Sequence, residues 1–484
     1  MNTYSSNKET HHLILIVGPY LLLHLTIRLL FSQTLQVDDA EQIRHAQNLL
    51  LGYPIPQPPL YSWLSWGLFQ ILGTGLLALT LLKYILITLT FWATWLSSGY
   101  LFKHIQTRYL ALFAFLLMPS FAWHMHQGFT HTILLGFAIA VSLHALLRLT
   151  QHQKPIDYLY LGAALGVGVM AKYSFLLFMV PLFISALSIK TVRQQLLQRR
   201  ALFMVAAFLL VTTPHLYWLS QHYQAVFPAI DQKLKVSADN SIFEQFKSLG
   251  NFFVAALAFV APWIFLFIHK PTKKQEAVGT ELGAQLLSRF YLVLLLITLL
   301  LALFYTMPHF KVRWFHPFMM LFPLWWLTMI EGEKPFSQVR IRWVYSVTII
   351  FTILIIAVRL VQVTIGPELG HYGRLNRPIM ETLEKLPPMT KLTQPRNEVV
   401  KLLTNDDFLG AHLLSYYPDN AIAIRGVWYR ESGQNSKEEA RCIQLWDSDD
   451  EHLLPPTDVE VEKITTQVAE VKYTLFWASL KKCP

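Results

Sequence analysis

Charged residues are scarce in this chain of 484 residues, because Asp, Glu, Lys and Arg together make up only 14% of it. Ordinary soluble domains carry about 25% charged residues. Hydrophobic residues make up 54% of the chain, so a soluble fold would have too little polar surface to cover its core. The composition therefore excludes an ordinary soluble protein and predicts a polytopic membrane protein.

Several features of other protein classes are also missing. Lys and Arg number 40 against 30 Asp and Glu, yet no nucleic-acid module surrounds a basic patch. In a membrane protein such an excess usually marks cytoplasmic loops and contacts with anionic lipid. We find no internal repeat, and most charges lie at the ends of apolar runs. Transporters often show repeats and ionisable residues near the bilayer midplane, so these absences argue against transport.

The N-terminal region lacks the marks of a cleaved signal peptide. A polar start leads into "LILIVGPYLLLHLTIRLLF", which is long and ends without an A-x-A-like site. A signal peptide has a shorter apolar stretch and a small-residue cleavage site. We therefore expect this run to be retained as the first transmembrane helix.

Apolar runs long enough to cross a bilayer, or nearly so, recur along the chain. We count about 11 of them, which lie at 12–31, 76–98, 108–123, 130–149, 157–171, 173–189, 201–219, 248–269, 288–306, 314–330 and 342–363.

The stretch 157–189 is too long for one ordinary span and has Lys172 in its middle. If it forms two short helices, the basic loops at 103–108, 148–154 and 190–200 all fall on one side of the membrane. A single helix would place the strongly basic loop 190–200 on the opposite side. The positive-inside rule favours the two-helix hairpin, with the N-terminus cytoplasmic and the C-terminus outside.

The composition changes after residue 366, where Gly and Pro interrupt the helical pattern. We predict a transmembrane domain over 1–366 and a small α/β exterior domain over 367–484. Both cysteines, Cys442 and Cys483, lie in this second part. An oxidising exterior permits a disulfide, but the sequence leaves two free thiols equally open.

The first exterior loop, 32–75, carries two adjacent acids, Asp38 and Asp39. They open an amphipathic stretch that predicts a helix lying in the interface, with an acid near its N-terminus, where the helix dipole favours an anion. The prolines that follow forbid a continuous helix. "LYSWLSWGLFQIL" then predicts a second interfacial helix with a Trp/Tyr belt. The alternative reading of Asp38 is a simple N-cap.

These elements resemble the GT-C glycosyltransferases of the protein O-mannosyltransferase and lipid A aminoarabinose transferase superfamily. That family carries Asp-Glu at the start of the first external loop, followed by Lys-Pro-Pro-Leu and an aromatic residue. Here Asp38 and Asp39 are followed by "QPPLYSW", residues 57–63. Further similar stretches are "LGVGVMAKYSFLLFMVP" with Lys172 at the family's lysine, "TPHLYW" (213–218) and "FKVRWFHPFMMLFPLWW" (310–326). The resemblance covers roughly residues 10–335.

The resemblance implies a GT-C fold and a reaction. A sugar on a polyprenyl phosphate would pass, with inversion, to an acceptor on the exterior face. A carboxylate near the reacting carbon can act as general base, and the family pattern places Asp38 at the catalytic position and Asp39 at the second acidic position. Both remain candidates, and a purely structural role for both is the alternative.

The leaving lipid phosphate needs positive charge nearby. Lys172, Lys311 and Arg313 all fall on the exterior side and are candidate phosphate contacts. Their alternatives are a snorkelling lysine and ordinary interfacial charge.

The chain departs from the family at two positions that bear on donor recognition. Gln57 stands where the family has a lysine, and His131 and Thr132 stand where it often has an aspartate. We list Gln57, Tyr61 and His131 as possible substrate contacts. The departures favour a divergent member over the aminoarabinose transferase itself.

The exterior histidines His124, His126 and His131 also suggest a divalent cation. A polar rim is the commoner role for such residues, so we assign no metal ligand and no certain cofactor.

The sequence thus predicts an integral-membrane glycosyltransferase of a bacterial inner membrane. Its partners would be a polyprenyl-phosphate-linked sugar, the bilayer, and an acceptor that is an envelope glycolipid, polymer or protein. A flippase or transporter of lipid-linked sugars, or a polysaccharide polymerase or ligase, is the rival function. Activity of the purified protein in detergent would separate chemistry from transport.

Overall fold

The structure is a computed structural model of the whole chain. It describes residues 3–234, 242–267, 281–304, 312–366, 368–369, 374–386, 399–430, 440–447 and 461–480.

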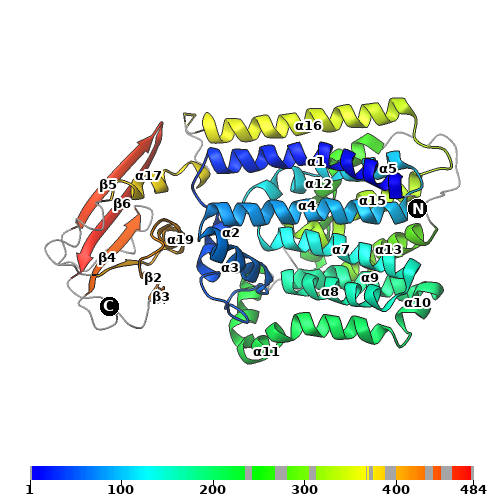
Figure 1. Ribbon diagram of the computed structural model, residues 1–484, viewed down its shortest axis with the longest axis horizontal. Helices are drawn as coiled ribbons and strands as arrows, with labels where there is room; N and C mark the ends of the chain where they lie inside the picture. Colours follow the sequence, from blue (N-terminus) through cyan, green and yellow to red (C-terminus); the bar gives the residue numbers. More distant parts are fainter. Residues whose placement is uncertain are drawn as a thin grey trace. The chain divides into compact units, whose positions relative to one another are not determined.

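All regular secondary structure among the described residues up to 364 is helical (Figure 1). The helices up to residue 200 are α1 (Thr3–Leu30), α2 (Val37–His45), α3 (Leu60–Leu72), α4 (Leu76–Leu101), α5 (Ile105–Leu117), α6 (Pro119–Ala122), the 3₁₀ helix η1 (His124–His126), α7 (His131–His152), α8 (Pro155–Ala171), η2 (Tyr173–Phe175), α9 (Leu176–Ser188) and α10 (Lys190–Leu196). The later ones are α11 (Ala201–Leu234), α12 (Ile242–Phe267), α13 (Glu281–Phe304), η3 (Val312–Phe315), α14 (His316–Met319), α15 (Phe322–Ile330) and α16 (Gln338–Thr364).

Among the described residues, six helices are long and apolar enough to cross a membrane, or up to eight if each of two bent helix pairs is one span. Three shorter apolar helices, Val17–Leu30, Pro155–Ala171 and His316–Ile330, coincide with other apolar runs in the sequence. The chain is a polytopic helical membrane protein, and the number of about 11 spans stays a prediction.

The break inside 157–189 is confirmed. α8 ends at Ala171, and Lys172 has extended backbone angles, φ −166° and ψ 135°. A single 3₁₀ turn follows before α9 begins at Leu176. An extended residue cannot continue an α-helix, so Lys172 divides the stretch into two helices.

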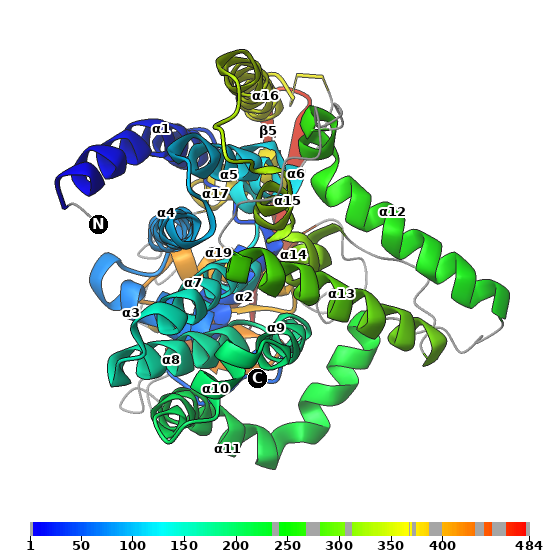
Figure 2. The ribbon, with the colours of Figure 1, turned by 90° about the vertical axis from the view of Figure 1, so that its right-hand side faces the viewer.

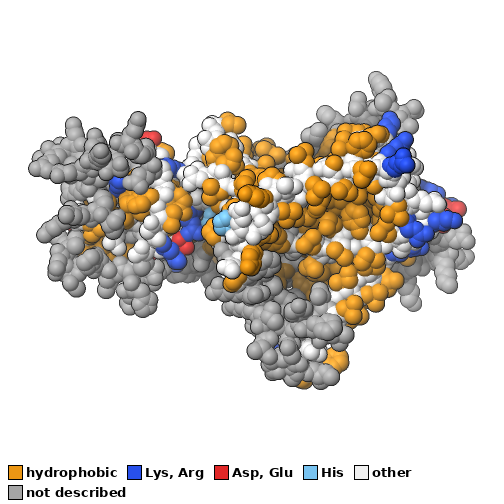
Figure 3. Space-filling view, turned by 90° about the horizontal axis from the view of Figure 1, so that it is seen from below, with side chains coloured by type: hydrophobic (Ala, Val, Ile, Leu, Met, Phe, Trp, Pro, Cys, Tyr) orange, Lys and Arg blue, Asp and Glu red, His pale blue; other side chains and the backbone are white. Residues whose placement is uncertain are grey.

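Exposed side chains on the helices are largely apolar, as Figure 3 shows for one face. Leu210 on α11 is 80% exposed and Ile350 on α16 is 65% exposed. A water-soluble protein rarely exposes a continuous apolar surface of this kind. Lys190, Arg193, Arg199 and Arg200 are also exposed, in and beyond α10.

The described residues after α16 contain helices and a mixed sheet. Their elements are η4 (Arg374–Asn376), α17 (Ile379–Leu383), β1 (Val399–Thr404), α19 (Asp407–Tyr416), β2 (Ile422–Ile424), β3 (Val427–Tyr429), β4 (Ala440–Asp447), β5 (Val461–Val468) and β6 (Val471–Leu480). The strand order is β3-β2-β1-β4-β6-β5. β1 pairs in parallel with β2 and β4, and the other neighbours pair antiparallel. The helix α19 connects the parallel strands β1 and β2.

The contacts divide the chain into two compact units. The first unit contains Met1–Leu49, Ser62–Tyr84 and Ile356–Pro484, and the second contains Leu50–Tyr61 and Ile85–Ile355. The first unit therefore groups the end of α16 and the residues after it with α1, α2, most of α3 and the start of α4. The division at residue 366 stays a prediction.

One hydrophobic core joins the segments of the first unit. Leu35 and Ile43, from the loop and helix around the acids, belong to the same buried cluster as Leu409, Leu413 and Ile424 from the sheet region. Burial of this apolar surface is what holds α2 against α19.

In the second unit, α8 packs against α7 and α11, and α9 packs against α13 (Figure 2). Small residues allow the close approach of α8 to α11, because a Cβ added to Gly162 would collide with the backbone carbonyl of Met204. Such contacts are typical of helix pairs in membranes.

Cys442 is buried in β4 and is disulfide-bonded. Cys483 lies outside the described residues.

Candidate functional site

The two acids lie at the start of α2, in the first unit. α2 begins at Val37, and the backbone N–H of Gln36 donates to Oδ2 of Asp39 over 3.4 Å. The N-cap residue is Gln36, so Asp38 is not the N-cap, and Asp39 lies at the third helical position, from which its carboxylate reaches back to the N-cap. An acid in the first helical turn is stabilised by the exposed N–H groups and the helix dipole.

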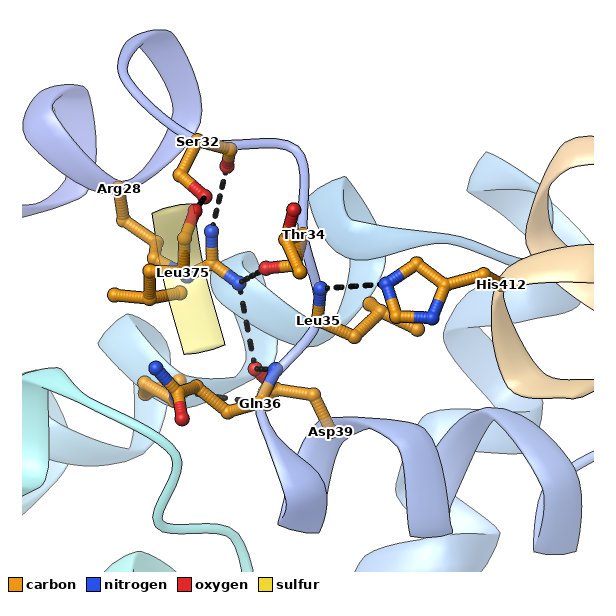
Figure 4. Close-up of polar contacts among 9 residues, drawn as sticks. Arg28, Ser32, Thr34, Leu35, Gln36, Asp39, Leu375 and His412 are labelled. Atoms are coloured by element: carbon orange, nitrogen blue, oxygen red, sulfur yellow. Dashed lines mark hydrogen bonds and ion pairs between the residues drawn. The ribbon is translucent and has the colours of Figure 1, made fainter. Parts of the chain in front are cut away.

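Asp39 is buried and ion-paired on both oxygens, and Figure 4 shows its contact with Arg28. Its side chain is 1% exposed, with Oδ2 3.5 Å from the guanidinium of Arg28 and Oδ1 3.6 Å from Nζ of Lys83. Both cations are equally buried, at 2% side-chain exposure each. A buried carboxylate is tolerated only when it is paired in this way. Asp38, by contrast, is only half-buried.

Arg28 connects these acids to the end of α1. Its guanidinium donates to the carbonyl oxygens of Ser32 at 2.7 Å and Thr34 at 2.9 Å. A cation at the C-terminal end of a helix is favoured by the dipole, and the two carbonyls that Arg28 binds belong to the turn that follows the end of α1 at Leu30. One side chain therefore fixes the turn that leads from α1 into α2.

The sequence reasoning missed Arg28 and Lys83. Both lie in apolar runs, where a charged residue is costly and marks a functional or structural contact. Lys83 lies about two turns into α4, so it is not at the extreme end of its helix. Charged residues inside apolar runs were the signal that could have identified this pair.

Three of the other predicted residues, Lys172, His131 and Tyr61, come together in the second unit. Nζ of Lys172 donates to Oγ1 of Thr132 over 3.0 Å. Nδ1 of His131 lies 3.2 Å from the carbonyl oxygen of Ala171. The ring of Tyr61 contacts the ring of His131, with centroids 5.5 Å apart. The start of α7 and the break after α8 are thereby held together.

Gln57 lies in the proline-rich segment of the same unit. Its side-chain Oε1 is buried, and no hydrogen-bond partner for it is found in the described part of the chain. A buried amide oxygen without a donor is costly. A ligand that supplies a donor would satisfy it.

A second hydrogen-bonded group adjoins Lys172. The hydroxyl of Tyr173 lies 2.9 Å from Nε2 of His215, whose Nδ1 is 3.0 Å from the carbonyl oxygen of Leu51. The rings of His215 and Trp218 stack, as do those of Trp218 and His222. His215 is the histidine of "TPHLYW", so this stretch fixes the segment that carries Gln57 and Tyr61.

The remaining candidates are only partly described. Lys311 lies outside the described residues, and Arg313 belongs to η3 by its backbone but its side chain lies outside the described part. His124 and His126 form η1. Within the described ranges, no group of three or more His, Cys, Asp or Glu side chains could hold a metal ion.

Comparison with known proteins gives consistent matches. The family model described as dolichyl-phosphate-mannose-protein mannosyltransferase matches residues 56–218. The chain is 28% identical over 420 residues to the lipopolysaccharide core galacturonosyltransferase RgtB of Rhizobium johnstonii, covering 86% of this chain and 83% of that protein. It is 26% identical over 419 residues to RgtA of the same organism, covering 85% and 81%.

The fold is similar to that of ArnT from Cupriavidus metallidurans. The crystal structure bound to undecaprenyl phosphate matches with a TM-score of 0.54 at 13% identity, over 96% of this chain and 98% of that one. The apo structure matches with a TM-score of 0.57 at 11% identity, over 97% and 98%. At this identity the match concerns the fold alone.

Proposed function

We propose that this chain, a GT-C glycosyltransferase of the ArnT and protein mannosyltransferase family, transfers a sugar from a polyprenyl-phosphate donor to lipopolysaccharide. Two observations support the substrates. The relatives RgtB and RgtA are named for galacturonosyl transfer to the lipopolysaccharide core. ArnT, which shares the fold, has been crystallised with undecaprenyl phosphate. A galacturonosyl polyprenyl phosphate is therefore the first donor to test.

The two acids are proposed to have different roles, and the burial of Asp39 carries this assignment. Asp39 is 1% exposed and has a cation against each oxygen, so an acceptor hydroxyl cannot reach it. Asp38 is only half-buried at the same helix start. In the proposed reaction, Asp38 takes the proton of the acceptor hydroxyl while that oxygen attacks the anomeric carbon, and the lipid phosphate leaves from the opposite face.

Lys172 is proposed as a contact to the donor phosphate. Its ammonium group, which donates to Thr132, carries a positive charge at the break between α8 and α9. Charge-assisted bonds to a phosphate would stabilise the negative charge that develops on the leaving group. Lys311 and Arg313 are proposed for the same task on the sequence resemblance alone. Gln57, Tyr61 and His131 are proposed substrate contacts.

The proposed location is the inner membrane of a bacterium, with the reaction on the periplasmic face. The exposed Lys190, Arg193, Arg199 and Arg200 would then lie in the cytoplasm, as the positive-inside rule expects. The N-terminus would be cytoplasmic and the domain after residue 366 periplasmic. Cysteine labelling of intact cells at position 199 and at position 425 tests this orientation.

The direct test of the function uses purified protein in detergent micelles. Galacturonosyl polyprenyl phosphate and core lipopolysaccharide would be incubated with it, and the product weighed by mass spectrometry. We expect the acceptor to gain the mass of one hexuronic acid residue. A gain with an aminoarabinose donor instead would change the sugar but keep the reaction, and no transfer with either donor would contradict the proposal.

Transport of a lipid-linked sugar is the rival function. Micelles have no two sides, so transfer in them requires chemistry. Transfer by the purified protein would therefore exclude transport as the sole activity.

A further inference from the structure

Three hydrogen bonds connect the turn before the acids to the region after α16, and Figure 4 shows those made by Ser32 and Leu35. The hydroxyl of Ser32 donates to the carbonyl oxygen of Leu375 over 2.6 Å. The hydroxyl of Thr34 donates to the carbonyl oxygen of Arg377 over 2.7 Å. The backbone N–H of Leu35 donates to Nε2 of His412 over 3.0 Å.

The contact to His412 differs from the other two because a side chain supplies the acceptor. His412 is completely buried in α19, and its Nδ1 lies 2.8 Å from the carbonyl oxygen of Phe408. Nδ1 therefore carries the proton, which leaves Nε2 as the acceptor. Burial lowers the pKa of His412 to about 4, so the neutral acceptor form predominates at neutral pH.

The hydrogen bond lies immediately before α2. Leu35 donates to His412, and the next residue, Gln36, donates to Asp39. Arg28 meanwhile binds the carbonyl oxygens of Ser32 and Thr34. The backbone from the end of α1 to the first turn of α2 is thus fixed from two sides, by a helix of the transmembrane region and by a helix of the region after α16.

α19 is stabilised by an N-cap and by core packing, so the position of His412 is fixed. Asp406 caps the helix, accepting from the backbone N–H groups of Phe408 and Leu409 at 2.6 and 3.3 Å. Leu409 and Leu413 pack in the same core as Ile43 of α2. The acceptor at Nε2 is consequently fixed relative to the helix that carries the acids.

We propose that His412 is a positioning residue for the transfer reaction, and that it aims Asp38 by holding the amide of Leu35 at the entrance of α2. The region after α16 then contributes to the position of Asp38 at the start of α2. This proposal rests on the role given above to Asp38. A displacement of a catalytic group by about 1 Å can cost on the order of 100-fold in rate, so loss of this hydrogen bond should lower kcat.

Two variants of similar polarity test whether His412 positions Asp38 or only stabilises the fold. His412→Gln places an amide oxygen near the position of Nε2, within reach of the Leu35 amide. His412→Asn keeps a polar group near Nδ1 but is too short to reach Leu35. We expect His412→Gln to retain kcat within a few-fold of wild type, and His412→Asn to lower kcat by roughly 10- to 100-fold with the donor KM little changed.

The control is His144→Leu, which also removes a buried histidine, one that lies 3.0 Å from the hydroxyl of Tyr160 in the second unit. It should lower the melting temperature without the selective fall in kcat. A second variant of the same turn, Thr34→Val, removes the bond to Arg377 and should lower kcat several-fold while keeping the side-chain shape.

The proposal is overturned if His412→Asn matches wild type in kcat, if Gln and Asn are equally impaired, or if His144→Leu shows the same fall in kcat at the same loss of melting temperature. If neither His412 variant folds, Thr34→Val tests the proposal instead. A normal kcat in Thr34→Val would contradict the positioning of Asp38 by this turn. Wild-type protein without transfer activity would instead contradict the proposed function.

Discussion

At the scale of single residues, the adjacent acids are made different by their neighbours. Asp39 is paired with Arg28 and Lys83 inside the protein, whereas Asp38 remains half-buried. We therefore propose different roles for two acids with the same chemistry: Asp39 holds the helix and Asp38 meets the substrate.

The first prediction concerns Asp39. Asp39→Asn should lower the free energy of unfolding by roughly 3 to 5 kcal/mol, because two buried cations lose their counter-charge. Thermal unfolding in detergent, followed by intrinsic fluorescence, measures the change. Asp38→Asn is the matched control and should unfold within a few degrees of wild type. Equal melting temperatures for the two variants would show that the ion pairs of Asp39 add no stability.

A second prediction concerns the phosphate contact. Lys172→Met should raise the donor KM or lower kcat/KM by at least about 10-fold, since a charge-assisted bond to the donor is lost. Steady-state transfer at varied donor concentration measures it. Thr132→Val removes the partner hydroxyl but keeps the ammonium group, and it should affect kcat/KM much less. Normal donor kinetics in Lys172→Met would rule out a phosphate contact at this position.

At the scale of elements, the start of α2 is held by His412 of α19, and the stability of the protein should therefore depend on pH. The pKa of His412 is lowered by burial from 6.5 to about 4. Its contribution to stability is complete above pH 6.5, the value in the unfolded chain, and is lost as the pH falls from 6.5 toward 4. The loss should reach about 3 kcal/mol.

The measurement is the melting temperature of wild type and His412→Gln between pH 7.5 and 4. Carboxylates also titrate in the lower part of this range. The effect of His412 is therefore measured as the difference in melting temperature between the two proteins at each pH. Wild type should lose stability faster than the variant on acidification. Parallel curves would show that His412 is not held in its neutral form.

The pair of helices α8 and α11 gives a further prediction. Gly162→Ala should destabilise the protein by about 1 to 3 kcal/mol, because the added methyl group collides with the backbone at Met204. Gly250→Ala in α12 is the control, since its Cβ would meet nothing within 4 Å. Thermal unfolding of both variants checks this, and a stable Gly162→Ala protein would mean that the two helices can separate.

At the scale of the whole molecule, local patterns in the sequence predicted much of the helical part. The length of an apolar run and the charge of a loop are properties of residues that are close together in the sequence. The break at Lys172 could therefore be inferred from them. The acidic pair at the start of a helix was also visible, because it is a local motif.

Long-range pairing could not be predicted in the same way. Leu35 and His412 are 377 residues apart, and no periodicity or motif connects them. The choice between the two acids likewise depends on which of them meets Arg28 and Lys83, and this is decided by the packing of α1, α2 and α4.

In the proposed reaction, Asp38 is the base of the sugar transfer and Asp39 only supports the helix that carries it. The most direct measurement is hexuronic acid transfer to core lipopolysaccharide by purified Asp38→Asn and Asp39→Asn, each assayed at a temperature where it is folded. We expect loss of activity by at least about 100-fold in Asp38→Asn and measurable transfer in folded Asp39→Asn. Near-normal transfer by Asp38→Asn, with none by folded Asp39→Asn, would contradict this proposal.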